Sequence, residues 1–318
     1  MSTPFGPGSV SLGLHPATTL PAREQVNVLL GWARAAEAAG FDGVTLSEHH
    51  AGFPGYMPAP LMGAGWILEN TRRVWAGPAA MVLGLRNPML LAEELAWLAA
   101  RNPGRVGAAF APGYVLEDFE AAGVPHDDRT RFPQKLAALA GALSTGGPLG
   151  KDPAVQQWAE APGPLLSAGN SRAAVERAAS HPGMGLLFPG AVDPDRLGRL
   201  AGLYRDAGGS GNVVGIRPIW VGTPPDTPEA RAQKLHYERS AAPGMRQAQG
   251  FDDWMLSGSA DQVIDGTAAW MRRCGVSAVN IRLSVAGVSP AQIADQIAAV
   301  GERVLPGLRS AIAAETPG

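Results

Sequence analysis

The residues with the clearest capacity for chemistry are Glu48, His49 and His50, which stand side by side after the apolar segment 41–46. The loop that follows, 51–60, is rich in glycine and proline and carries no charge. An imidazole titrates near neutral pH, so it can accept or donate a proton under physiological conditions. A neighbouring carboxylate favours its charged form. The pattern predicts an acid–base group, with His49 and Glu48 as the catalytic residues, although a polar strand end without a catalytic role remains an alternative.

A metal site is the other chemistry that two histidines suggest. Adjacent residues of an extended chain point in opposite directions, so one metal ion rarely takes both. The single cysteine, Cys274, excludes a site rich in thiolates. The remaining histidines show no HxH or HxxxH spacing, and only His15, at the end of the first apolar segment, could approach the pair. We therefore expect no metal, with His50 pointing away from the site.

The segment 167–171, Ser-Ala-Gly-Asn-Ser, ends an apolar run and opens a helical pattern. Free N–H groups and the positive end of a helix dipole favour anions at such a turn, and a phosphate suits it. Ser and Asn are also common there merely as helix caps.

Two alanines, Ala79 and Ala80, lie near the end of the segment 73–83. Small side chains at a strand end leave room for a flat ring against the backbone, and close packing is the competing explanation. Walker A, GxSxG and SxxK patterns are absent from the sequence, so nucleotide hydrolysis and serine-based acyl transfer have no residue support.

These residues must be positioned by a repeating pattern of eight strand and helix segments. The predicted strands cover 9–14, 41–46, 73–83, 105–111, 163–169, 183–189, 212–222 and 277–283. The predicted helices cover 21–40, 60–71, 87–102, 131–144, 171–180, 193–208, 260–273 and 290–304.

Eight such units predict an α/β fold, a (β/α)8 TIM barrel formed by residues 1–318 as a single domain. An open, doubly wound sheet is the alternative, but no GxGxxG follows the first strand. The long connections 112–130 and 223–257 both follow strand ends, so we expect them over the catalytic face, with 223–257 as an insertion or lid. His49 and the turn at 167–171 would then face each other across the barrel mouth.

Composition narrows the function classes further. Hydrophobic residues make up 46% of the 318 residues and charged residues 17%, which predicts a compact globule. A net charge of -2 offers no basic face for nucleic acid. The N-terminus lacks a signal-peptide pattern, and the prolines within 51–68 argue against a membrane helix there. The sequence alone therefore predicts a cytoplasmic protein without a membrane or nucleic-acid partner.

Several motifs together resemble the bacterial luciferase-like monooxygenases. They are "AAEAAGFDGVTLSEHH", "RRVWAGPAAMVLGLRNPMLLAEELAWLAARNPGRVGAAFAPGY", "EDFEAAGVPHDDR", and the C-terminal "GSADQVIDGTAAWMRRCGVSAVNIRL" and "QIAAVGERVLPGLR". The resemblance covers nearly the whole chain in order. It implies a (β/α)8 barrel, often dimeric, that binds reduced FMN or the deazaflavin F420.

The resemblance also implies roles for particular residues. His49 matches the proton-transfer histidine with Glu48 beside it, and Ala79–Ala80 matches a position where a cis peptide often lies under the flavin ring. Where luciferase has a Cys-Arg pair that helps hold the phosphate, this chain has Ala111 and Pro112, and Arg86 is a candidate replacement. The implied cofactor contacts are Leu46, Ala79, Ala80, Ala111, Gly169, Asn170 and Ser171.

The resulting prediction is an FMN-dependent, two-component monooxygenase. A partner reductase would supply reduced FMN, and O2 would oxidise a small organic substrate that the sequence does not name. The alternatives are an F420-dependent oxidoreductase that transfers hydride and a non-catalytic flavin-binding protein. FMN is favoured because Glu-His-His resembles the flavin branch and no lysine-rich patch suits the F420 tail.

Overall fold

The computed structural model describes residues 2–17, 19–53, 55–190, 192–232, 235 and 255–314. Most of the predicted lid at 223–257 lies outside these residues. Within them, no helix combines the length and apolar character that crossing a lipid bilayer requires.

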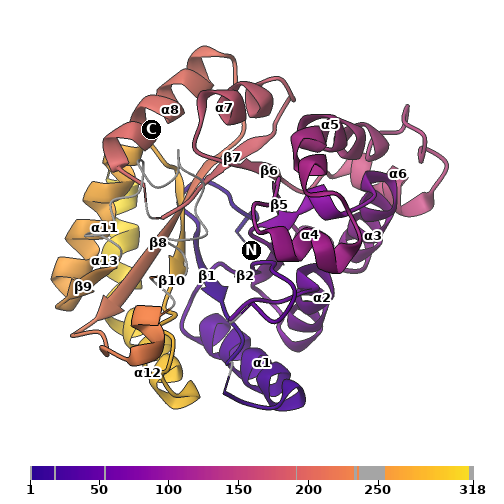
Figure 1. The fold of residues 1–318 in the computed structure, drawn as a ribbon. Coiled ribbons are helices and arrows are strands. Elements are labelled where there is room, and N and C mark those ends of the chain that lie inside the picture. Colours follow the sequence, from indigo (N-terminus) through magenta and orange to yellow (C-terminus); the bar gives the residue numbers. More distant parts are fainter. Residues whose placement is uncertain are drawn as a thin grey trace.

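Parallel strands form a ring at the centre of the molecule (Figure 1). Each predicted strand is present, as β1 (Val10–Leu14), β2 (Gly43–Leu46), β3 (Trp75–Pro78) with β4 (Met81–Val82), β5 (Ala108–Ala111), β6 (Leu165–Ala168), β7 (Gly185–Phe188), β8 (Val213–Val221) and β10 (Ala278–Arg282). Strand β1 pairs with both β2 and β10, so the first and last strands are neighbours. The predicted (β/α)8 barrel is therefore confirmed.

The predicted strand 73–83 is divided into two parts. Strand β3 pairs with β2, whereas β4 pairs with β5 on the other side. Between them lies a cis peptide bond, Ala79–Ala80. A parallel bridge from Ala76 to Val106 completes the ring next to this break. A short strand, β9 (Leu256–Gly258), lies off the ring and pairs with β8.

The predicted helices surround the ring. They are α1 (Ala22–Ala38), α2 (Pro60–Asn70), α3 (Pro88–Arg101), α5 (Phe132–Ala142), α7 (Arg172–Ala179), α8 (Pro194–Asp206), α11 (Ala260–Cys274) and α12 (Pro290–Arg303). The structure adds the helices α4 (Leu116–Ala122), α6 (Pro153–Glu160) and α13 (Leu305–Ala313) and the short 3-10 helices η1 (Leu83–Leu85) and η2 (His126–Arg131). The predicted connection 112–130 thus contains α4 and most of η2.

Side-chain caps explain where several helices begin. The Asn87 side chain accepts hydrogen bonds from two backbone N–H groups of the first turn of α3, and Pro88 occupies its first position. Ser259 and Gln262 form a capping box at the start of α11, which ends before Gly275 in the left-handed conformation. These caps are local in sequence, and they match the predicted starts of these helices.

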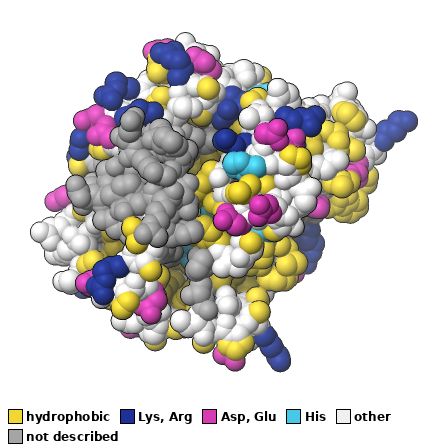
Figure 2. All heavy atoms as spheres, in the orientation of Figure 1, with side chains coloured by type: hydrophobic (Ala, Val, Ile, Leu, Met, Phe, Trp, Pro, Cys, Tyr) yellow, Lys and Arg dark blue, Asp and Glu magenta, His cyan; other side chains and the backbone are white. Residues whose placement is uncertain are grey.

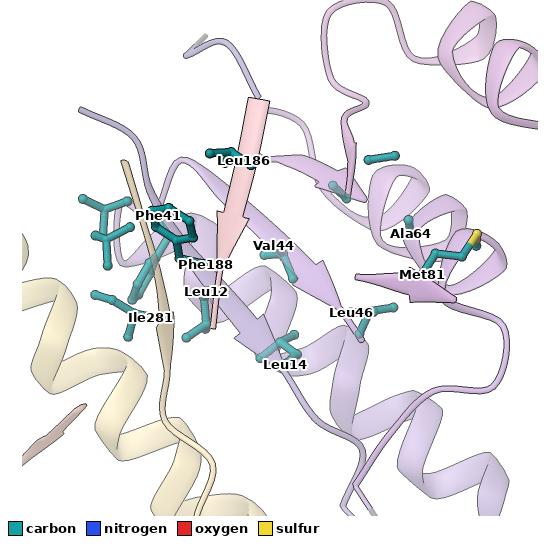
Figure 3. Packing of buried hydrophobic residues seen from close by; sticks show 14 of the residues in the cluster. Leu12, Leu14, Phe41, Val44, Leu46, Ala64, Met81, Leu186, Phe188 and Ile281 are labelled. Carbon is teal, nitrogen blue, oxygen red and sulfur yellow. The ribbon is translucent and has the colours of Figure 1, made fainter. Parts of the chain in front are cut away.

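The core has two parts. Leu12, Val44, Leu46 and Ile281 belong to the large cluster of residues between the ring and its helices (Figure 3). A smaller cluster fills the interior at the end where strands begin, and Phe5 packs there on Trp75 with ring centroids 4.5 Å apart. Because this end is filled, the carboxyl ends of the strands are left for chemistry.

Two glycines allow the ring to close beside β4. A Cβ built on Gly77 in β3 would lie 1.7 Å from the carbonyl oxygen of Gly107, which precedes β5. Backbone cannot move aside as a flexible side chain can, so only glycine fits at position 77.

We predict that Gly77→Ala destabilises the protein by at least about 1–3 kcal/mol, the usual cost of overpacking. The control is Gly31→Ala in α1, where a Cβ would meet nothing within 4 Å. It should stabilise the helix by up to about 1 kcal/mol. Urea unfolding of both variants measures the difference, and equal stability of Gly77→Ala and wild type would contradict this packing.

Candidate active site

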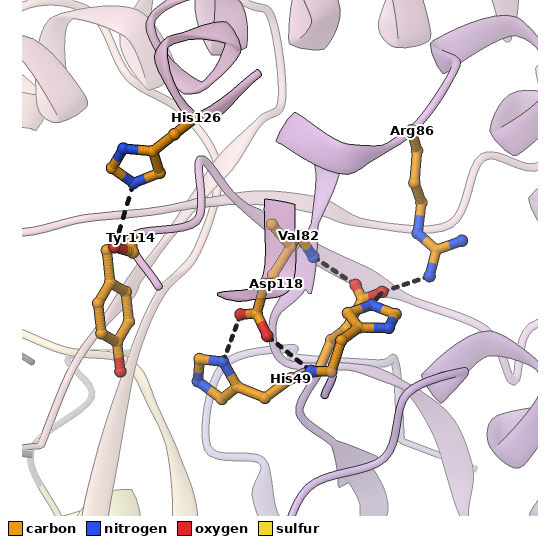
Figure 4. A network of polar contacts seen from close by, with 8 residues as sticks. His49, Val82, Arg86, Tyr114, Asp118 and His126 are labelled. Carbon is orange, nitrogen blue, oxygen red and sulfur yellow. Dashed lines mark hydrogen bonds and ion pairs between the residues drawn. The ribbon is translucent and has the colours of Figure 1, made fainter. Parts of the chain in front are cut away.

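The carboxyl end of β2 places His49 at the mouth of the barrel, where it meets the connection after β5 (Figure 4). His49 Nδ1 lies 2.7 Å from Oδ2 of Asp118, a residue of α4. The other oxygen of the same carboxylate accepts the backbone N–H of His50 at 2.6 Å. One acidic side chain therefore fixes both the imidazole and the backbone that carries it.

Asp118 is a carboxylate in the folded protein. Burial alone would raise its pKa, but the hydrogen bonds from His49 and from the His50 backbone lower the pKa below its ordinary value. An ionised carboxylate only accepts hydrogen bonds, so His49 must donate through Nδ1. Its second nitrogen, Nε2, then carries the lone pair and has no hydrogen-bond partner among the described residues.

Aromatic side chains enclose the His49 ring. Phe53 is stacked on it with a centroid separation of 4.2 Å, and Tyr56 meets it edge-on at 4.6 Å. Tyr114 makes a second edge contact at 5.6 Å. The uncharged loop after His50 supplies two of these rings, so it forms one wall around His49. His49 itself is only 8% exposed.

Glu48 does not stand beside His49 as expected, because the carboxylate on His49 belongs to Asp118. Glu48 is buried and accepts a backbone hydrogen bond from Val82 at 2.6 Å. It also forms an ion pair with Arg86 and lies 2.8 Å from His50 Nε2. These contacts join the end of β2 to β4 and η1, so the geometry gives Glu48 a positioning role.

The cis peptide lies directly against this strand end. The Ala79 N–H donates to Leu46 at 2.8 Å, and the Glu48 N–H donates to the Ala80 carbonyl at 3.1 Å. The Ala79 carbonyl accepts from Ser47 Oγ at 2.6 Å and from Arg282 Nη2 at 2.8 Å. Both carbonyls of the Ala79–Ala80 turn are thereby held by neighbouring strands.

Arg282, at the end of β10, was not identified from sequence. Its guanidinium is buried and also donates to Asn280 Oδ1 at 2.8 Å and to His15 Nε2 at 3.2 Å. Gly13 on β1 makes room for it, since a Cβ there would lie 2.2 Å from Arg282 Nε. The sequence signal for this arginine was Gly13, because a glycine that pairs with an arginine on the neighbouring strand leaves room for the long side chain.

Small side chains form a floor at the mouth. Ala80 lies just before β4, whereas Ala111 ends β5 and Ala168 ends β6, so the three partly exposed alanines occupy neighbouring points of the ring. Such a surface accommodates a planar group against the backbone. Leu46 does not join it: its side chain lies in the outer cluster against Gly63 of α2, so only its backbone borders the cis peptide.

The turn after β6, which the sequence predicts to bind a phosphate, leads directly into α7. Ser171 caps α7 by accepting the Ala174 N–H at 3.2 Å, and Gly169 and Asn170 are half-buried before it. The glycine is required because a Cβ at position 169 would lie 2.6 Å from the Ala174 Cβ.

Arg177 supplies positive charge to this turn. Its Nε donates to Ser167 Oγ at 3.3 Å, and its guanidinium lies 4.6 Å from the centre of the Phe132 ring. Burial lowers its pKa. Arg86, the replacement arginine considered from sequence, instead pairs with Glu48. Arg177 lies in the last turn of α7, two residues before its end at Ala179, where the sequence offered no signal for an anion site.

The two adjacent histidines take different partners: His49 contacts Asp118, whereas His50 contacts Glu48. Within the described residues no group of three or more His, Cys, Asp or Glu side chains could hold a metal ion. Cys274 is buried in α11, and burial raises its pKa to about 12, which makes it unreactive.

Comparison with known proteins gives a consistent family. A family model described as luciferase-like monooxygenase matches residues 8–305. The 4-hydroxyprotoasukamycin monooxygenase of Streptomyces nodosus subsp. asukaensis is 26% identical over 248 residues, 73% of this chain. The match spans 60% of that protein's length. An F420-dependent glucose-6-phosphate dehydrogenase of Beutenbergia cavernae is 33% identical over 119 residues, 35% of this chain and 34% of its own length.

Solved structures share the fold. The monooxygenase RslO1 of Streptomyces bottropensis superposes with a TM-score of 0.76 at 21% identity, covering 94% of this chain and 99% of its own. The oxygenating constituent of the 3,6-diketocamphane monooxygenase of Pseudomonas putida, in complex with FMN, gives 0.71 at 18% identity, covering 95% and 98%.

We predict that Asp118→Asn lowers stability by about 2 kcal/mol at pH 7, since hydrogen bonds to charged groups contribute about 1.5–3 kcal/mol. The pKa of Asp118 is lower in the folded than in the unfolded chain. Its contribution is therefore complete above the ordinary carboxyl range and is lost as the pH falls through the lowered pKa.

Urea unfolding of wild type and variant from pH 7 downward measures this difference. Asp127→Asn, at an exposed position in the same connection, is the control and should change stability by less than about 0.5 kcal/mol. A difference in the free energy of unfolding between wild type and Asp118→Asn that grows as the pH falls would contradict a charged Asp118 in the folded protein.

Proposed function

Since the chain, matched by the family model over residues 8–305, belongs to the luciferase-like monooxygenases, we propose that it is an FMN-dependent enzyme that uses reduced flavin and O2 on a small organic substrate. The observation that carries the proposal is the His49–Asp118 pair at the barrel mouth, beside the cis peptide at Ala79–Ala80.

The residues at the mouth fit a flavin. The half-exposed floor of Ala80, Ala111 and Ala168 suits a flat isoalloxazine ring. The turn of Gly169, Asn170 and Ser171, which directly follows Ala168 and leads into α7, suits the phosphate, with the Arg177 cation close by. When bound, reduced FMN would supply the electrons that activate O2.

Proton transfer is assigned to His49. Asp118 keeps the proton of the neutral ring on Nδ1, so Nε2 is the atom that accepts or returns a proton. The aromatic enclosure by Phe53, Tyr56 and Tyr114 limits the access of water to this nitrogen. Glu48 acts indirectly, because its contacts to Val82 and Arg86 hold the strand end in place.

We prefer FMN to F420 because the relative that matches the larger part of this chain is a monooxygenase. The chain matches a monooxygenase over 73% of its length, whereas its match to an F420-dependent dehydrogenase covers 35%. A separate reductase is part of the proposal, and one structural neighbour is named as the oxygenating constituent of its monooxygenase. F420-dependent hydride transfer is the second candidate, since the matched F420 enzymes share this fold.

Anaerobic titration with reduced FMN and with reduced F420 tests the choice of cofactor. We expect saturable FMN binding that F420 does not displace. Tight binding of F420 with no binding of FMN would favour the dehydrogenase instead.

His49→Gln should then retain FMN affinity but lose about 10²–10⁴-fold in product formation, the usual contribution of general acid–base catalysis. Product is measured as ¹⁸O incorporated from ¹⁸O2 into a panel of organic compounds, with an added NADH-dependent flavin reductase. His181→Gln, after the end of α7, is the matched control and should behave as wild type. Unchanged turnover in His49→Gln would mean that His49 has no catalytic role.

We also propose that the protein is a homodimer in which α2 and α3 form the contact surface. The two helices pack together where Gly65 faces Leu98, and they expose Met62, Leu90 and Trp97 at 51%, 58% and 55%. Hydrophobic side chains are visible on this side of the molecule in Figure 2. Large apolar side chains gathered on adjacent helices favour burial against a second copy.

Trp97→Glu should convert such a dimer to monomers by placing a charge in the apolar contact. Light scattering after size exclusion measures the mass. Leu116→Glu, at a residue that is 48% exposed but lies on α4, should leave the dimer intact. A monomeric wild type, or a dimer that tolerates Trp97→Glu, would exclude this interface.

A further inference from the structure

A second pocket opens at the mouth, between the ends of β1 and β10 and the helices α1 and α12. Its wall is largely apolar, because Leu14, Trp32, Val285, Val288, Ile293 and Ile297 line it. The indole N–H of Trp32 already donates to the Pro290 carbonyl at 3.1 Å, so the ring offers the pocket no free donor. The polar side chains of interest there are His15 and Ser284.

The protonation of His15 is fixed by its neighbours. Arg282 Nη1 lies 3.2 Å from Nε2, and a guanidinium can only donate, so Nε2 accepts. Burial and the Arg282 cation lower the pKa of His15 well below its usual range, so the ring is neutral. A neutral imidazole carries one proton, which must therefore be on Nδ1.

This protonation decides what Ser284 can do. His15 Nδ1 donates to Ser284 Oγ at 2.5 Å, so the serine oxygen is the acceptor in that bond. The serine O–H is then left to donate. In the described part of the chain, the contact with His15 is the one hydrogen bond of the Ser284 side chain, so the O–H has no acceptor there. His15 has no lone pair directed at the serine, so the two do not form a base and nucleophile.

The pocket lies next to the proton-transfer site. The Tyr56 ring meets His15 edge-on at 5.1 Å and His49 at 4.6 Å. A molecule in the pocket would therefore be separated from His49 by one aromatic ring. Arg282 joins the two sites on the other side, since it contacts both His15 and the Ala79 carbonyl.

We propose that this pocket binds the organic substrate and that Ser284 donates a hydrogen bond to an uncharged oxygen on an otherwise apolar molecule. The inference rests on the proposed monooxygenase function, because it assigns the pocket to that reaction. An anionic substrate is disfavoured: Arg282 already donates to Asn280, His15, Ser47 and Ala79, and His15 is neutral. A carboxylate would lose its hydration here and gain hydroxyl donors but no cation among the described lining residues.

A pair of nearly isosteric probes tests the donor. Acetophenone carries a carbonyl oxygen where α-methylstyrene carries a methylene group, and benzoate carries a charge. Ligand-observed NMR titration of the full-length protein, as purified, gives the affinity for each. Wild type should bind acetophenone about three- to tenfold more tightly than α-methylstyrene, the range expected for one neutral hydrogen bond.

Ser284→Ala should reduce this preference, since it leaves the His15 Nδ1–H in place of the hydroxyl, and Ser284→Thr, which keeps the hydroxyl, should restore it. Ser144→Ala is the control, because that exposed hydroxyl bonds only to Gly141 in the turn after α5. Val288→Trp fills the pocket and should remove measurable binding of both probes. FMN affinity should be unchanged in every variant.

Three results would overturn the proposal: equal binding of the two probes by wild type, an undiminished preference in Ser284→Ala, or tighter binding of benzoate than of acetophenone. Undiminished binding by Val288→Trp would place the probes elsewhere and would also overturn it. Because the probes are titrated without flavin, such a failure is distinct from a failure to bind FMN.

Discussion

The hydrogen bond between Asp118 and His49 is the interaction on which the site depends. It joins residues that are 69 positions apart, and it ties the connection after β5 to the end of β2. The same carboxylate holds the His50 backbone. Burying a carboxylate is costly unless it is hydrogen-bonded, so these two bonds also explain how α4 can carry Asp118 beneath the surface. The ring orientation, its tautomer and the position of α4 all follow from one side chain.

A second buried carboxylate supports the first. Glu48 holds the backbone of β4 through Val82, forms an ion pair with Arg86 and contacts His50. The cis peptide lies between these contacts and the Arg282 guanidinium from β10. Side chains from opposite ends of the sequence therefore fix the same short piece of backbone. A flavin bound above it would rest on a surface that is held from both sides.

The barrel could be predicted because its signals are local. Apolar runs, caps such as Asn87 and stop signals such as Gly275 lie within a few residues of the elements they define. Asp118 could not be predicted as the partner of His49, since α4 is short and lacks a side-chain cap. Two further placements could have been predicted, because adjacent residues of an extended chain point to opposite sides. This rule separates the side chains of Glu48 and His49. It also turns Leu46 outward, since its neighbour Thr45 faces Asn280 inside the ring.

The most direct test of the account is the position of the proton on His49. Nitrogen-15 NMR of the imidazole side chains, with His49 assigned by comparison with His49→Gln, distinguishes the two neutral tautomers. We predict that the neutral ring carries its proton on Nδ1, in a hydrogen bond with Asp118, and that Nε2 is unprotonated. A neutral His49 with its proton on Nε2 would contradict it, because Nδ1 would then have nothing to donate to Asp118.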